Sequence, residues 1–146
     1  MTRINCVPVE TLSDAHLVAE YRELPRIIGA ATLFYVNHGK DADPLADAPK
    51  SIPPERYRLG FTHLKFFYKK LLWLQTRFAQ LVKEMKYRGF HVTFHSLPEA
   101  NLPANFWQEW QPTEEDMALC QSRLKVRTDE SILRKQEKLR IKGFYK

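Results

Sequence analysis

The chain has 146 residues, of which 44% are hydrophobic and 27% charged, a composition typical of one globular domain. No run of 18 apolar residues and no secretory signal pattern occurs, so the sequence favours a soluble, cytoplasmic protein over a membrane or exported one. Cys6 and Cys120 stand far apart with no second pair, which excludes a four-cysteine zinc site and a disulfide scaffold.

The net charge of +6 is concentrated in two segments. Residues 60–91 hold seven Lys or Arg against one acidic residue, and residues 121–146 hold nine against three. The segment between them, 92–120, holds five acidic residues and no Lys or Arg. A basic domain favours a polyanionic partner such as nucleic acid. The two basic segments are expected to form the surface that binds it.

The first predicted element is a helix that begins after Ser13, a favourable N-cap, with Asp14 adding acidic charge to the first turn. Its apolar stripe, at helical spacing, consists of Leu17, Tyr21, Leu24 and Ile28. Pro25 interrupts the stripe. Because apolar spacing continues to Phe34, we expect one kinked helix rather than two helices.

Residues 39–59 are predicted to form a loop. They contain four of the nine prolines, together with Gly39 and three aspartates. About 20 residues without secondary structure is long for a compact domain, so much of this loop is expected to be mobile.

One long second helix is predicted from Thr62, as its cap, to Gly89. A continuous apolar stripe runs along it, and Gly89 followed by Phe90 is typical of a Schellman-type helix end. Phe66 and Trp73 lie on the opposite side. The helix is therefore expected to pack on both faces, and packing is favoured over base stacking for Trp73.

Residues 91–112 are predicted to be irregular and anchored by aromatic side chains, namely Phe106, Trp107 and Trp110. A third helix is predicted from Thr113, which can cap an acidic first turn, to about Leu139. Its apolar pattern is sparse beyond Leu124, so the distal half is expected to project from the core. Residues 135–146, at the end of this helix, are expected to fray.

These elements predict an all-α fold, with residues 1–146 forming a single compact domain of three main helices and a long proline-rich loop. The first helix also has a polar face, made of His16, Arg22, Glu23 and Arg26. Taken alone, this face also fits a solvated surface on which Glu23 and Arg26 form a weak ion pair.

Several segments together form a longer pattern. They are Thr2-Arg3-Ile4-Asn5, Ala19 to Arg26 with His16 before it, Thr62 to Lys70, Arg88-Gly89-Phe90 and, more weakly, Gln121 to Leu124. This pattern resembles the phage endonuclease V family of pyrimidine-dimer DNA glycosylase/AP lyases. The resemblance implies an N-terminal segment threaded between helices, so that the Thr2 amine approaches Glu23.

The resemblance implies DNA repair chemistry on pyrimidine dimers in duplex DNA, without a metal or another cofactor. The implied nucleophile is the α-amine of Thr2 after removal of Met1, which forms an imine at C1′ of the damaged nucleotide. Glu23 then assists β-elimination. The amine suits this role, because an α-amine has a pKa of about 7.7–8.0 against about 10.4 for lysine and is partly neutral near pH 7.

The resemblance also implies a set of DNA-binding residues, and we expect the protein to be a monomer. They are Arg3, His16, Arg22, Arg26, His63, Lys65, Lys69 and Lys70. Within this set, Arg22 and Arg26 would clamp phosphates around the lesion, and Arg3 would assist beside the amine.

Two departures from the family pattern leave lesion selectivity open. Ala15 stands where the family has a glutamine, and the family's C-terminal Trp-Tyr-Lys cluster is absent, leaving aromatic residues only at Phe144 and Tyr145. One alternative is the same chemistry on another modified or oxidised base. The other is a basic DNA-binding protein without catalysis.

Overall fold

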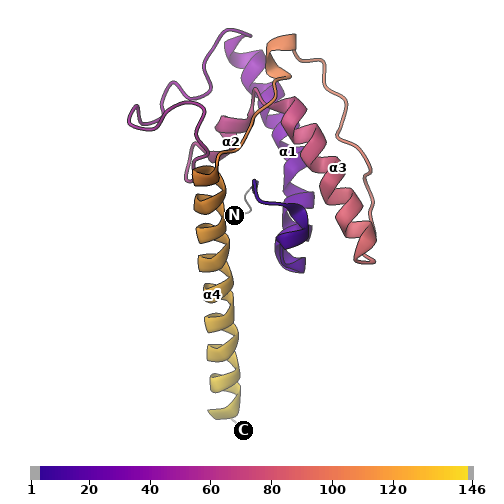
Figure 1. Cartoon of the computed structure of the whole chain (residues 1–146), viewed down its shortest axis with the longest axis vertical. Helices are drawn as coiled ribbons and strands as arrows, with labels where there is room; N and C mark the ends of the chain where they lie inside the picture. Colours follow the sequence, from indigo (N-terminus) through magenta and orange to yellow (C-terminus); the bar gives the residue numbers. More distant parts are fainter. Residues whose placement is uncertain (1–3, 145–146) are drawn as a thin grey trace.

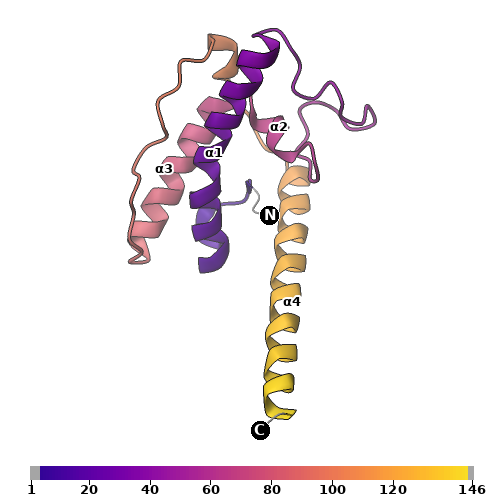
Figure 2. The ribbon, with the colours of Figure 1, turned by 180° about the vertical axis from the view of Figure 1, so that it is seen from behind.

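The computed structural model describes residues 4–144, and all regular secondary structure in that range is helical. The helices are α1 (Asp14–His38), α2 (His63–Phe67), α3 (Leu71–Tyr87) and α4 (Glu114–Phe144), with short 3-10 turns η1 (Val9–Thr11) and η2 (Ala104–Phe106). Helices α1 and α3 lie side by side, while α4 runs well past them (Figures 1 and 2). The predicted all-α fold with three main helices is confirmed.

Helix α1 begins and continues as predicted. The Ser13 hydroxyl accepts a hydrogen bond from the His16 amide at 3.2 Å, which caps the first turn. Pro25 stands inside the helix without ending it. The helix ends at Gly39, where φ is 85° and the amide donates to the Tyr35 carbonyl at 2.8 Å.

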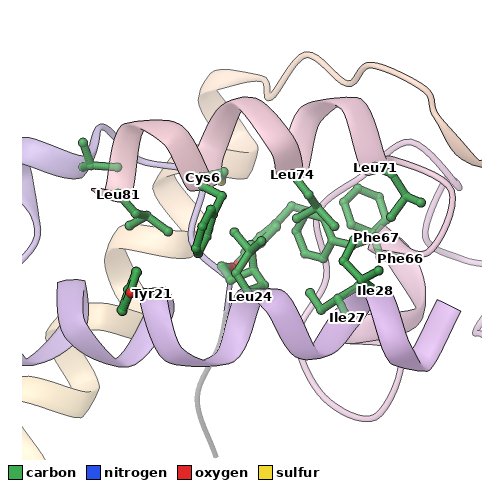
Figure 3. Close-up of a cluster of buried hydrophobic side chains, with 14 of the residues drawn as sticks. Cys6, Tyr21, Leu24, Ile27, Ile28, Phe66, Phe67, Leu71, Leu74 and Leu81 are labelled. Carbon is green, nitrogen blue, oxygen red and sulfur yellow. The ribbon is translucent and has the colours of Figure 1, made fainter. Parts of the chain in front are cut away.

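The core lies between α1 and the two helices α2 and α3. Figure 3 shows side chains of α1 facing those of α2 and α3, and the central ones are Leu24, Ile27, Phe66, Phe67, Leu71 and Leu74. All six are at most 1% exposed. Full burial of one such side chain contributes about 1.5–3 kcal/mol, so this interface dominates the stability of the fold.

The single long second helix predicted from Thr62 to Gly89 is wrong, because residues 68–70 separate α2 from α3. At the break the Phe66 carbonyl accepts from Lys70 Nζ at 2.9 Å, in place of a backbone donor. On the α3 side the Trp73 amide donates to the Gln108 carbonyl at 3.4 Å. The break therefore depends on a side chain and a remote carbonyl, which hydrophobic periodicity cannot detect.

The predicted end of the second helical region is confirmed. Gly89 has a φ of 84°, and the Phe90 amide donates to the Met85 carbonyl at 2.9 Å. The Gly89 amide donates to the Lys86 carbonyl at 3.0 Å, which completes the Schellman pattern.

The coil between α3 and α4 is held by aromatic packing, as predicted. Phe106 is fully buried. The Trp110 ring lies 4.9 Å from that of Trp73 and 5.0 Å from that of Phe66. Trp73 also stacks on Phe67 at 5.5 Å, so it packs within the fold. The proline-rich loop is anchored as well, through buried Leu45, Ala48 and Tyr57.

Helix α4 starts with a reciprocal cap. The Thr113 hydroxyl accepts from the Asp116 amide at 3.2 Å, and Asp116 Oδ2 accepts from the Thr113 amide at 2.8 Å. Every side chain that the structure describes beyond Arg127 is exposed, which confirms the projecting distal half. The fraying expected of residues 135–146 stays a prediction. No helix between residues 4 and 144 is long and apolar enough to span a membrane.

Candidate active site around the N-terminal segment

Residues 4–7 are buried in the middle of the molecule and contact all the main helices. The Ile4 amide donates to His63 Nε2 at 2.9 Å, and its carbonyl accepts from the Tyr57 hydroxyl at 2.7 Å. The Cys6 thiol donates to the Asp116 carbonyl of α4 at 3.5 Å. In Figure 1 this part of the chain passes between α1 and α4. The expected threading of the N-terminal segment is confirmed for these residues.

A buried ion pair supports the same segment. Arg77 Nε lies 2.7 Å from Glu20 Oε2, Arg77 Nη2 lies 3.0 Å from Glu20 Oε1, and the two side chains are 4% and 0% exposed. Asn5 Nδ2 donates to the same carboxylate at 2.8 Å, and Arg77 Nη1 donates to the Val7 carbonyl. Burial disfavours the guanidinium charge, but the Glu20 carboxylate more than offsets it and raises the pKa of Arg77.

Sequence reasoning did not find Glu20 or Arg77, although a signal was present. Glu20 follows Leu17 by three residues and precedes Leu24 by four, so it falls within the apolar stripe of α1. Arg77 occupies a similar position next to Phe78 in α3. A charged residue on each of two facing apolar stripes is the pattern that predicts a buried pair.

We expect Arg77→Met to lower the free energy of unfolding by about 3–5 kcal/mol, because it leaves the Glu20 carboxylate buried without a counter-ion. The double variant Arg77→Met/Glu20→Gln removes that charge and is expected to recover part of the loss. Urea unfolding of the wild type and both variants measures this difference. A single variant that loses less than about 1 kcal/mol would show that water reaches Glu20.

On the polar face of α1, Glu23 lies one helical turn after Glu20, the residue that contacts the anchored segment. Glu23 Oε1 lies 3.2 Å from Arg26 Nη1, with Glu23 31% and Arg26 76% exposed, so the structure brings together the pair expected at i,i+3. Arg22 and Arg26 both line an open cavity of about 490 Å³. Exposed guanidinium groups at the edge of a cavity are placed to contact phosphate oxygens.

His16 lies on the same helix, one turn before Glu20. Its Nδ1 is 3.1 Å from the Ser13 hydroxyl oxygen. Burial and, secondarily, the cation of Arg127 lower the pKa of His16.

The structure places His63 differently from the DNA-facing position that the resemblance implies. The side chain is only 1% exposed. Its Nδ1 lies 2.8 Å from the Arg58 carbonyl oxygen, and its Nε2 accepts from the Ile4 amide. A carbonyl requires a donor, so Nδ1 carries the proton and leaves Nε2 free to accept. His63 therefore positions the N-terminal segment from inside the core.

The three lysines of the predicted DNA-binding set differ in the contacts that they make within the protein. Lys69 Nζ donates to the carbonyls of Lys40 and Ala42 at 2.9 and 2.8 Å, which ties down the start of the proline-rich loop. Lys70 Nζ lies 3.8 Å from the centre of the Phe66 ring, and burial lowers its pKa to about 8. Lys65 is half-buried at the edge of a second cavity. Direct DNA contact by these lysines stays a prediction.

Two residues of the predicted site, Thr2 and Arg3, lie outside the described residues. Among residues 4–144, no group of three or more His, Cys, Asp or Glu side chains is placed to hold a metal ion. A family model described as pyrimidine dimer DNA glycosylase matches residues 1–96 of the chain. The matched part contains the N-terminal segment, α1, α2 and α3, and it ends before α4.

Proposed function

Because the chain belongs to the pyrimidine dimer DNA glycosylase family, we propose that it excises pyrimidine dimers from duplex DNA and then cleaves the abasic site as a lyase. The observation that carries this proposal is the anchoring of residues 4–7 by His63, Tyr57 and Arg77. A segment that adjoins the proposed nucleophile and is held in the core by side chains of three different regions is suited to present a reactive group at a defined place.

The proposed nucleophile is the α-amine of Thr2. Thr2 precedes Asn5 by three residues, which limits their separation to about 10 Å. Asn5 is bonded to Glu20, and Glu23 is the neighbour of Glu20 at i,i+3 on the same helix. The amine is therefore within reach of the Glu23 carboxylate.

The reaction can be written with these groups alone. The neutral amine attacks C1′, the bond from C1′ to the base breaks, and the base leaves with one of the two protons of the amine nitrogen. The amine nitrogen then loses its proton as the sugar ring opens to the imine, and O4′ takes up a proton. Glu23 next accepts a proton from C2′, and the C3′–O bond breaks with departure of the phosphate. Arg22 and Arg26 would hold the flanking phosphates during these steps.

Borohydride trapping tests this mechanism. We expect the chain that begins at Thr2 to form a covalent adduct with an abasic duplex when borohydride reduces the imine. Mass spectrometry should map the adduct to the N-terminal peptide. No adduct, or an adduct on a lysine side chain, would refute the proposed nucleophile.

The lesion is tested separately from the nucleophile. Duplexes that carry a cyclobutane pyrimidine dimer, a ring-opened purine or an abasic site are incubated with the same protein. We expect incision at the dimer and at the abasic site. Incision at the purine lesion and the abasic site, but not at the dimer, would keep the imine chemistry and change the substrate.

A further inference from the structure

The distal half of α4 is a helix with nothing packed on it. The helix has 31 residues, which corresponds to about 46 Å. No side chain described between residues 128 and 142 is buried, and this part projects past α1 and α3 (Figures 1 and 2). It also lies outside the part of the chain that the family model matches. Packing within the fold therefore does not explain why the chain has this helical extension.

The cations of this helix gather on one face. At about 100° per residue, six of them fall within about 60° of Cys120 on the helical wheel. This basic face consists of Arg123, Arg127, Arg134, Lys135, Lys138 and Lys142. The three acidic residues of the same stretch fall at least about 80° away. They are Asp129, Glu130 and Glu137.

The basic face points toward the side of the molecule that holds the candidate active site. Cys120, at the centre of that face, is fully buried, and its thiol donates to Asn5 Oδ1 at 3.5 Å. Asp116, one turn earlier on the same face, accepts from the Tyr57 amide at 3.1 Å. The distal cations thus continue the face that packs against the N-terminal segment. The influence of Arg127 on His16 agrees with this direction.

The distal cations of this face form no ion pair among the described residues; they are Arg134, Lys135, Lys138 and Lys142. In this part of α4 the structure describes an ion pair between Arg140 and Glu137, and both lie off the basic face. Arg123 is half-buried, and its Nε has no hydrogen-bond partner among the described residues. A buried donor without a partner is destabilising, and a bound anionic oxygen would satisfy it.

We propose that the basic face of α4 binds the phosphate backbone of duplex DNA on one side of the lesion. This inference rests on the proposed function, which brings duplex DNA to the adjacent site. From Arg127 to Lys142 the helix rises about 22 Å, the length of about six to seven base pairs. Repeated cations at this spacing match repeated phosphates.

A second copy of the chain is a poorer match for this helix. The exposed apolar residues of the distal half do not form one stripe. Val126 and Leu133 lie on one side, whereas Ile132 and Leu139 lie about 100–140° away around the helix. Coiled-coil pairing requires apolar residues that repeat along a single seam, and six cations facing a copy of themselves would repel each other.

A pair of charge-matched variants tests the proposal. Arg134→Gln/Lys138→Gln removes two cations of the basic face, and Lys125→Gln/Arg140→Gln removes two from other faces of α4. Glutamine is as good a helix former as lysine or arginine, so the helix should persist in both. The measurement is the affinity of each protein for an undamaged duplex of about 30 base pairs across a range of salt concentrations.

We expect the basic-face variant to bind at least about tenfold more weakly, with the slope of log affinity against log salt smaller by about 1.8. The other variant should bind within about twofold of the wild type. Equal weakening in both would overturn the proposal, since overall charge would then explain the binding. Unchanged binding in the basic-face variant with a loss of dimers in sedimentation would overturn it in favour of a second copy.

Borohydride trapping of the wild type separates this inference from the proposed chemistry. Binding to undamaged duplex requires no imine. A wild type that is not trapped, but whose two variants differ as expected in binding, would refute the lyase mechanism and support the DNA-binding role of α4. Trapping of the wild type together with equal binding by both variants would support the lyase mechanism and refute the DNA-binding role of α4.

Discussion

A protein that keeps one residue before Thr2 is expected to form no borohydride-trapped adduct and to lose at least about 10³-fold in incision rate. The extra residue converts the Thr2 nitrogen into an amide, whose lone pair is delocalised and not nucleophilic. It also moves the new terminal amine by about 3.5 Å. Residues 4–7 are held in the core by hydrogen bonds with Tyr57, His63 and Arg77, so the chain cannot slide back to compensate.

Two preparations from one cleavable fusion provide the measurement. One is cut to begin at Thr2, and the other keeps a single glycine before it. Both should bind undamaged duplex equally, because the exposed cations of α1 and α4 are the same in each. Incision of an abasic duplex and trapping are then compared. Full activity in the glycine-extended protein would rule out the Thr2 amine as the nucleophile.

The parts of the fold that the sequence predicts well are those determined by neighbouring residues. The caps at Ser13 and Thr113 and the helix end at Gly89 each involve groups at most five positions apart. Such local hydrogen bonds follow directly from residue type and spacing. The helical periodicity of α1 identifies its buried stripe for the same reason.

The errors concern groups that meet only in the folded chain. The break between α2 and α3 depends on Lys70 and on a carbonyl of the distant coil. His63 carries a polar ring typical of a surface site, yet it is held by the Ile4 amide, 59 positions earlier. Periodicity treats each residue by type and face, so it cannot show which buried polar groups find partners.

In the candidate site, too, the local contacts are predicted by the sequence and the tertiary contacts are not. The i,i+3 pairing of Glu23 with Arg26 follows from helical spacing and is found at 3.2 Å. The contacts of Glu20 with Arg77 and Asn5, by contrast, join three segments that are far apart in the sequence. A family resemblance assigns the reactive groups, whereas the residues that hold them in place emerge from the tertiary contacts.

Glu23→Gln is expected to lower the rate of base release and strand cleavage by about 10²–10⁴-fold, with little change in stability or DNA affinity. Glutamine keeps the shape of the side chain, but it can neither stabilise the positive charge that develops at the sugar during base release nor accept the C2′ proton. The lost ion pair with Arg26 is largely exposed and contributes at most about 1 kcal/mol. Glu10→Gln removes an equal charge from an exposed carboxylate in η1 and serves as the control. Single-turnover incision at saturating DNA measures both, and a wild-type rate in Glu23→Gln would remove this carboxylate from the mechanism.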